Sequence, residues 1–136
     1  MKKMFVFLGI CSFVFAGCTK KDTVITVADA VTTGTWRVTN FSERTNNETS
    51  DFSGYTFTFQ SNGKVLVAKG GVIREGNWSE STSSQKMIID LGVKSDANKP
   101  LGELSDDWVI VSKTATKINL ADDNATSNEL LEFTKN

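Results

Sequence analysis

The chain of 136 residues contains no histidine, one proline and two cysteines. Zinc sites, Ser-His-Asp triads and Cys-His dyads draw on histidine or on a free thiol. Both cysteines, Cys11 and Cys18, lie close to the N-terminus, so the body of the chain has neither ligand type. These absences exclude zinc sites and most hydrolase mechanisms.

The first eighteen positions form a targeting signal. Two lysines are followed by an almost wholly apolar run over 4–15 and then by Ala16-Gly17-Cys18. A basic start, an apolar stretch and small residues before a cleavage site are typical of a secretory signal. The run is too short to span a bilayer, which needs about 20 apolar residues.

A cysteine directly after the small pair makes the segment resemble a bacterial lipoprotein signal, with Phe15 as one departure from that pattern. The resemblance implies that residues 1–17 are removed and that Cys18 becomes an acylated N-terminus carrying chains such as palmitate. The alternative is an ordinary secretory signal with an incidental cysteine.

On this resemblance the processed chain cannot form an internal disulfide, because Cys11 is removed with the signal and Cys18 carries lipid. Without Lys2 and Lys3 the chain has 13 basic residues against 16 acidic ones, a net charge of about −3. This mixed surface argues against nucleic acid as a partner and against adsorption to anionic lipid. The acyl chains on Cys18 are therefore expected to hold the protein at the membrane.

Residues 18–33 are expected to form a tether between the lipid and the folded domain. Thr19, rather than Asp, follows the cysteine, which in enterobacterial sorting favours the outer membrane. The charged run 20–22 resembles surface-export tags of Bacteroidetes-type lipoproteins, whereas a plain linker would leave the domain at the periplasmic face. The sequence leaves both destinations open.

From residue 35 onward the pattern indicates β-structure. Residues 55–59 alternate strictly, which places three aromatic rings on one face and two threonines on the other. Asn62-Gly63 lies between two such runs and predicts a hairpin. In all, eight strands are expected, at 35–41, 55–59, 64–69, 72–79, 86–91, 108–112, 116–120 and 129–134.

Two segments fall outside this rhythm. Residues 101–104, after Pro100, predict a single helical turn. Residues 24–31 fit either a strand or a short helix. Short strands with tight turns favour an antiparallel fold, and closing the sheet removes its exposed edges. We therefore predict a small all-β, up-and-down (meander) barrel over 34–136.

Gly34-Thr35-Trp36 at the head of this meander resembles the lipocalin family, and specifically the short lipocalin-like lipoproteins of Bacteroidetes-type bacteria. The other matching pieces are 55–59, 63–65, 76–78, 104–108 and 130–135. The resemblance implies that Gly34 and Trp36 close one end of the barrel. It also implies a cation packed on the indole, for which Arg37 and Arg74 are the candidates. The chain is shorter than a typical lipocalin and lacks its long C-terminal helix.

Five aromatic residues are candidates for the barrel interior or for the lining of a ligand pocket: Tyr55, Phe57, Phe59, Trp78 and Trp108. A small eight-stranded barrel is just wide enough for its own side chains to fill it. Core packing is therefore the stronger interpretation, and a cavity for an apolar ligand is the alternative.

The acidic residues indicate no metal centre. By alternation Asp90 lies opposite Met87, Ile89 and Leu91, so we expect it to face solvent. Asp106-Asp107 and Asp122-Asp123-Asn124 lack EF-hand spacing and fit turns or caps better than calcium ligands. We expect no cofactor.

Two functions fit these observations. The first is a membrane-anchored, lipocalin-like protein that binds a small apolar or amphipathic molecule inside the barrel. The second is a lipoprotein with a solid core that acts through its surface as an interaction or accessory module of the cell envelope. No glycine-rich loop or nucleophile elbow frames a catalytic group, so we expect no enzymatic activity. A cavity of a few hundred Å³ would favour the first function, and contact between the rings would favour the second.

Overall fold

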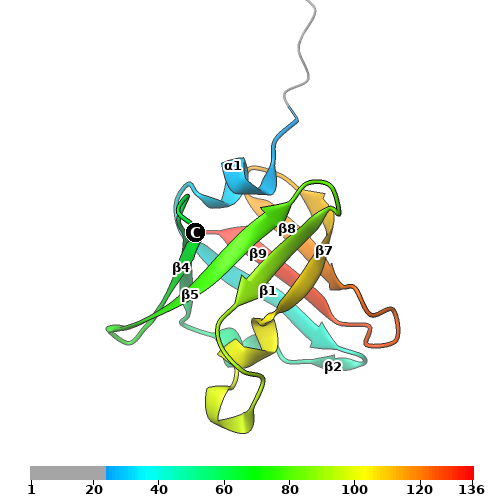
Figure 1. The fold of residues 1–136 in the computed structure, drawn as a ribbon. Helices are drawn as coiled ribbons and strands as arrows, with labels where there is room; N and C mark the ends of the chain where they lie inside the picture. The colour runs from blue at the N-terminus through cyan, green and yellow to red at the C-terminus, as the bar shows by residue number, and fades with distance from the viewer. Residues whose placement is uncertain (1–23) are drawn as a thin grey trace, which may run out of the picture.

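The computed structural model describes residues 24–136, which form a closed antiparallel β-barrel (Figure 1). Residues 1–17 and Cys18 lie outside the described residues. The strands are β1 (Trp36–Glu43), β2 (Asn46–Asn47), β3 (Thr56–Phe59), β4 (Lys64–Lys69), β5 (Val72–Ser81), β6 (Lys86–Asp90), β7 (Asp106–Lys113), β8 (Lys117–Asp122) and β9 (Leu130–Lys135).

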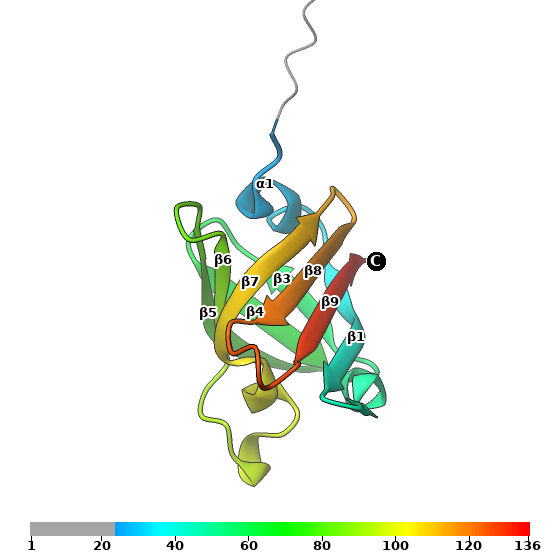
Figure 2. The same ribbon diagram turned by 90° about the vertical axis from the view of Figure 1, so that its right-hand side faces the viewer.

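Eight of these strands make the barrel, and the two-residue β2 pairs only with the end of β1. Consecutive strands from β3 to β9 are neighbours, and β9 pairs with β1, which closes the sheet. Figure 2 shows β7, β8, β9 and β1 side by side. The predicted all-β meander barrel is confirmed, and the range predicted for the strand 64–69 matches β4 at both ends.

The strand pairing that closes the barrel is shortest between β1 and β3. These strands share one paired position, Trp36 with Phe57. Among residues 24–136 the two strands share no further paired position, and the Phe41 N–H of β1 donates at 2.8 Å to Thr49 of the 3-10 helix η1 (Thr49–Phe52). Its Phe52 ring meets Phe41 of β1 edge-on, with centroids 5.2 Å apart. The sequence analysis predicted neither β2 nor η1.

The predicted hairpin at Asn62-Gly63 is present. Gly63 has a φ of +83°, a conformation that suits glycine. The Asn62 side chain accepts a hydrogen bond from the Lys64 N–H at 3.1 Å, which is the local bond expected of asparagine in a turn.

The segment 24–31 is a short helix, α1 (Val27–Val31), and not a strand. Thr26 and Asp29 form a reciprocal capping box: the Asp29 N–H donates to the Thr26 hydroxyl and the Thr26 N–H donates to the Asp29 carboxylate. Val27 and Val31 are fully buried. The folded domain therefore includes α1, which the sequence analysis had assigned to the tether 18–33.

The opposite end of the barrel carries the long connection between β6 and β7. It contains the 3-10 helices η2 (Asp96–Asn98) and η3 (Leu101–Leu104), the second at the predicted helical turn. Leu101 and Leu104 are buried. The barrel thus has α1 over one end and η3 at the other.

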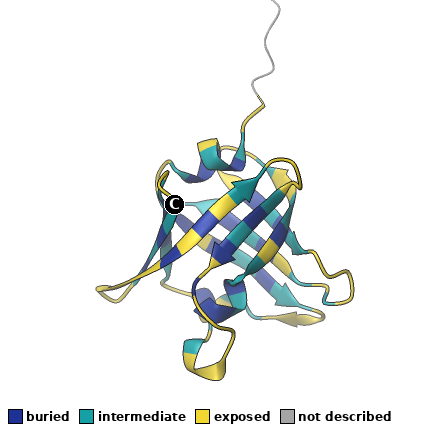
Figure 3. Cartoon of the chain, viewed as in Figure 1, coloured by how far each residue is buried: buried dark blue, intermediate teal, exposed yellow. Residues whose placement is uncertain are grey.

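The core follows the alternation of the strands, as the banded colours of Figure 3 show. In β6, Met87 and Ile89 are buried, while Asp90 is exposed and accepts the Gly92 N–H at 3.0 Å. The outward placement predicted for Asp90 is confirmed.

Gly76 of β5 provides a test of this packing. A Cβ at this position would lie 2.4 Å from the Asp90 carbonyl oxygen and 2.6 Å from Leu91 Cδ2. Gly76→Ala should therefore lower the free energy of unfolding by about 1–3 kcal/mol, the usual cost of overpacking. Urea denaturation measures the change. Gly70→Asn is the control, since Gly70 has a φ of +58° that asparagine tolerates and no atom within 4 Å of a Cβ, so its stability should be unchanged.

Candidate functional site

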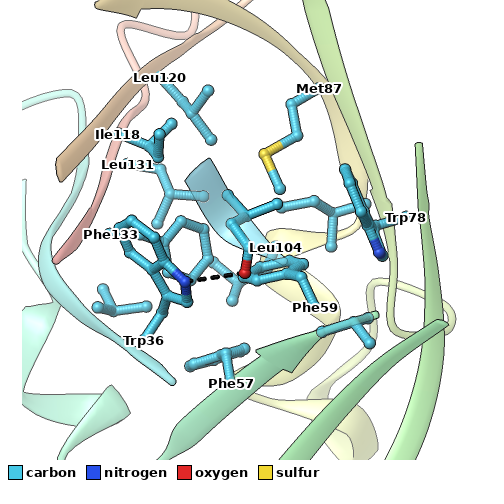
Figure 4. Close-up of a cluster of buried hydrophobic side chains, with 14 of the residues drawn as sticks. Trp36, Phe57, Phe59, Trp78, Met87, Leu104, Ile118, Leu120, Leu131 and Phe133 are labelled. Atoms are coloured by element: carbon cyan, nitrogen blue, oxygen red, sulfur yellow. Dashed lines mark hydrogen bonds between the residues drawn. The ribbon is translucent and has the colours of Figure 1, made fainter. Parts of the chain in front are cut away.

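The barrel interior is the first place to look for a site, and aromatic rings occupy it. Phe57 and Phe59 both meet Phe133 edge-on, with centroids 5.2 and 5.5 Å apart. Phe59 also meets Trp78 at 5.7 Å. Figure 4 shows the cluster that these side chains form with Met87 and other buried residues. Of the predicted interior residues, Phe57, Phe59 and Trp78 therefore lie together in the core.

Each tryptophan donates its indole N–H to a main-chain carbonyl. Trp36 Nε1 donates to Val31 O of α1, and Trp108 Nε1 donates to Leu104 O of η3, both at 3.0 Å. Trp78 Nε1 donates to Gln60 O at 2.9 Å, in the turn before β4. Trp36 and Trp108 are fully buried, so these bonds satisfy donors that water does not reach.

The cation at the barrel entrance is a lysine. Lys135 Nζ lies 5.2 Å from the Trp36 ring centroid, and the Lys135 side chain also contacts the position where a Cβ of Gly34 would be. The expectation of Arg37 or Arg74 in this role was wrong. Arg37 donates to the Lys135 carbonyl at 3.2 Å, and Arg74 donates to Asn98 at 2.7 Å.

Tyr55 is placed differently from the other aromatic candidates. It precedes β3, is partly buried at the edge of the core, and has Lys69 Nζ 4.3 Å from its ring centroid. Together with Val67, Val72 and Arg74 it lines a hollow of about 160 Å³ beneath the β4–β5 hairpin. Tyr55 therefore belongs to the rim of the barrel.

A larger groove of about 400 Å³ lies beside α1, between the β5–β6 turn and β7. Its deepest charged group is Glu80, whose side chain is only 6% exposed. The Glu80 carboxylate accepts the N–H groups of Val27 and Ala28 at 3.0 and 2.9 Å, so it caps the first turn of α1. The sequence analysis missed this role, because nothing in the strand pattern distinguishes Glu80 from a solvated residue.

Three carboxylates meet where β7 begins and β8 ends. Ligand oxygens of Asp106, Asp122 and Asp123 all lie within 4.8 Å of one another. Lysines already neutralise two of them: Lys94 Nζ is 2.7 Å from Asp106, and Lys86 Nζ is 2.8 Å from Asp123. The hydrogen bond to Asp123 raises the pKa of Lys86.

Asp122 and Asp107 of the same region have separate surroundings. Asp122 accepts the Asn124 N–H at 3.1 Å, which is the turn role expected of it. Asp107 is exposed and lies 3.9 Å from Lys86 Nζ.

Glu129 lies next to this acidic cluster, with Oε2 4.0 Å from Lys94 Nζ. The Glu129 side chain is 12% exposed, and its Oε2 has no hydrogen-bond partner among the described residues. Burial raises the pKa of the Glu129 carboxyl above its ordinary value of 4.5.

Because its pKa is raised on folding, protonated Glu129 favours the folded state. That contribution is complete below about pH 4.5 and is lost as the pH rises through the raised pKa. Glu129→Gln should therefore be more stable than the wild type at pH 7 and gain nothing at pH 4. Thermal unfolding at the two pH values measures this. The exposed Glu75→Gln serves as control, with an expected change below about 0.5 kcal/mol at both.

None of the helices in residues 24–136 is long and apolar enough to cross a membrane.

Comparison with known proteins identifies the fold. No family model matches the chain, and no curated protein matches it. Among solved structures, the crystal structure of a DUF4847 family protein from Bacteroides vulgatus superimposes with a TM-score of 0.60. The match has 16% sequence identity and covers 82% of this chain and 98% of the other. At this identity the two proteins share an architecture, and the neighbour comes from the bacterial group to which the sequence resemblance pointed.

Proposed function

We propose that this protein is a lipoprotein of the cell envelope, anchored to the outer membrane through Cys18, whose filled barrel acts through its outer surface as an interaction module. The observation that carries the proposal is the contact of Phe59 with Trp78 and Phe133 inside the barrel. Ligand pockets of about 300–1,000 Å³ bury their ligands, and this interior is taken by the protein's own rings.

The two ends of the barrel support the same proposal. A lipocalin-like binding protein needs one open mouth through which its ligand enters. Here α1 contributes the buried Val27 and Val31 at one end, and η3 contributes Leu101 and Leu104 at the other. The lipocalin resemblance therefore supports a barrel fold. The function that we propose for this barrel is not ligand binding in its interior but that of a scaffold with an interacting surface.

The proposed lipid anchor would also orient the barrel relative to the membrane. The described chain begins just before α1, which lies over one end of the barrel (Figure 1), so a lipid on Cys18 would hold that end toward the membrane. The six peptide units between Cys18 and Val24 would reach at most about 22 Å when extended. The η3 end and the β4–β5 hairpin would then be presented away from the lipid.

The first test concerns the anchor. Cys18→Ala should abolish incorporation of labelled palmitate, because it removes the thiol that the proposal acylates. Cys11→Ala, which changes a cysteine of the discarded signal, should leave this incorporation unchanged. Equal labelling of the Cys18→Ala protein would contradict lipidation at Cys18.

The second test concerns the interior. Native mass spectrometry of the protein purified from its own host should give the mass of the polypeptide with its acyl chains and nothing more. A small molecule that stays bound through purification, in a defined ratio to the protein, would contradict the filled barrel and restore the ligand-binding function.

A further inference from the structure

The β4–β5 hairpin has an edge that no strand covers. β5 pairs with β4 over residues 72–77, but it pairs with β6 only from Asn77 to Ser81. Within residues 24–136, the part of β5 from Val72 to Gly76 therefore has a neighbouring strand on one side only. Figure 1 shows this hairpin extending beyond the barrel wall.

The direction of the free backbone groups follows from one hydrogen bond. The Trp78 N–H donates to Gly63 O at 2.9 Å, on the β4 side. Successive residues of a strand point their N–H groups to opposite sides, and β5 pairs with both neighbours without a register shift. The N–H and C=O groups of Ile73 and Glu75 thus face away from β4, where the described chain offers them no backbone partner.

The tip of this edge is also apolar and exposed. Val72 and Ile73 are 64% and 66% exposed. Most proteins blunt such an edge with charges, proline or a covering segment, because it is a template for pairing with another chain. An open apolar edge in a protein proposed to act through its surface is a candidate binding element.

The hollow lined by Tyr55, beneath the β4–β5 hairpin, would make this edge selective for particular side chains of a partner. Its floor includes Val67 and the Tyr55 ring, and its cations are Lys69 and Arg74. Neither cation forms a salt bridge within the described chain. The Arg74 guanidinium is oriented by Asn98 at 2.7 Å and keeps further donors free. The chemistry of this hollow suits a carboxylate.

We propose that the free edge of β5 binds an extended, acidic segment of a partner protein by strand addition. The segment pairs antiparallel with residues 72–76, and main-chain bonds to Ile73 and Glu75 supply the affinity. Its residue opposite Arg74 is Asp or Glu, because cross-strand neighbours lie on the same face. The residue opposite Val72 is apolar, because Val72 is itself apolar and exposed.

Charge favours a partner protein over a second copy of this chain. Pairing two β5 edges around a two-fold axis at Arg74 would place the Arg74 side chains of both copies opposite one another, and like charges in that position are destabilising. The position of the hairpin agrees with a partner, since Val72 lies about 26 Å along β5 from Glu80, which caps α1 at the anchor end.

The probe is a blocked, fluorescent peptide with the core Leu-Thr-Glu-Val-Val, compared with the same peptide carrying Lys in place of Glu. Binding to the full-length lipidated protein in detergent is followed by fluorescence anisotropy, and the site is mapped by hydrogen exchange. The acidic peptide should bind at least about fivefold more tightly than the basic one. It should slow exchange in residues 72–76 and leave 117–122 unchanged.

Three variants distinguish the contribution of the main-chain hydrogen bonds from that of the charge. Ile73→Pro removes one outward N–H, which an edge strand tolerates, and should abolish binding, whereas Ile73→Thr keeps the N–H and should bind. Arg74→Glu should reverse the preference between the two peptides. Circular dichroism confirms that each variant is folded.

Three outcomes would overturn the inference: equal binding of the two peptides, no protection of residues 72–76 at about 1 mM peptide, or protection of 72–76 that rises with protein concentration without peptide. The last would assign the edge to a second copy. The inference rests on the proposed surface function, but its failure would leave the acyl label and the native mass unchanged, so the two are tested separately.

Discussion

A buried indole N–H must find an acceptor, and this requirement holds the barrel and its coverings together. Trp36, Trp78 and Trp108 each donate to a carbonyl of a connecting segment and not of a barrel strand. An unsatisfied buried donor or acceptor costs about 1–3 kcal/mol. Each covering segment is thus bonded to a ring that is itself core, so α1 and η3 are part of the folded domain.

Filling the interior changes where function can reside. The rings that would line a lipocalin pocket contact one another instead, and the polar features of the molecule lie on its rim. The groove beside α1, the acidic cluster between β7 and β8 and the hollow under the β4–β5 hairpin are all surface features. Within residues 24–136, the free edge of β5 combines backbone groups that no strand pairs, exposed apolar side chains, and two cations that form no salt bridge.

The strands were predictable because alternation and turns are local signals. The run 64–69 is bounded by Asn62-Gly63 and Gly70-Gly71, and its predicted range matches β4. The helix α1 was left open because five residues span too little of a helical repeat to separate it from a strand. Its capping box, Thr26 with Asp29, is the signal that would have decided it.

The contacts of the candidate site depended on the tertiary structure. Lys135 reaches Trp36 because β9 closes on β1, a pairing between residues almost a hundred positions apart. Glu80 likewise caps α1 through a long-range contact, since the fold places the end of β5 beside this helix. Sequence spacing indicates which residues have the required chemistry, and only the closure of the sheet determines which of them meet.

The filled interior is the claim on which this account depends, and xenon tests it most directly. Xenon enters dry apolar cavities that are large enough to hold it. Titration of the folded protein with xenon, followed through the methyl resonances of Met87, Leu120 and Leu131, should leave these signals unshifted. Saturable shifts at these methyl groups would show an open space inside the barrel and contradict the account.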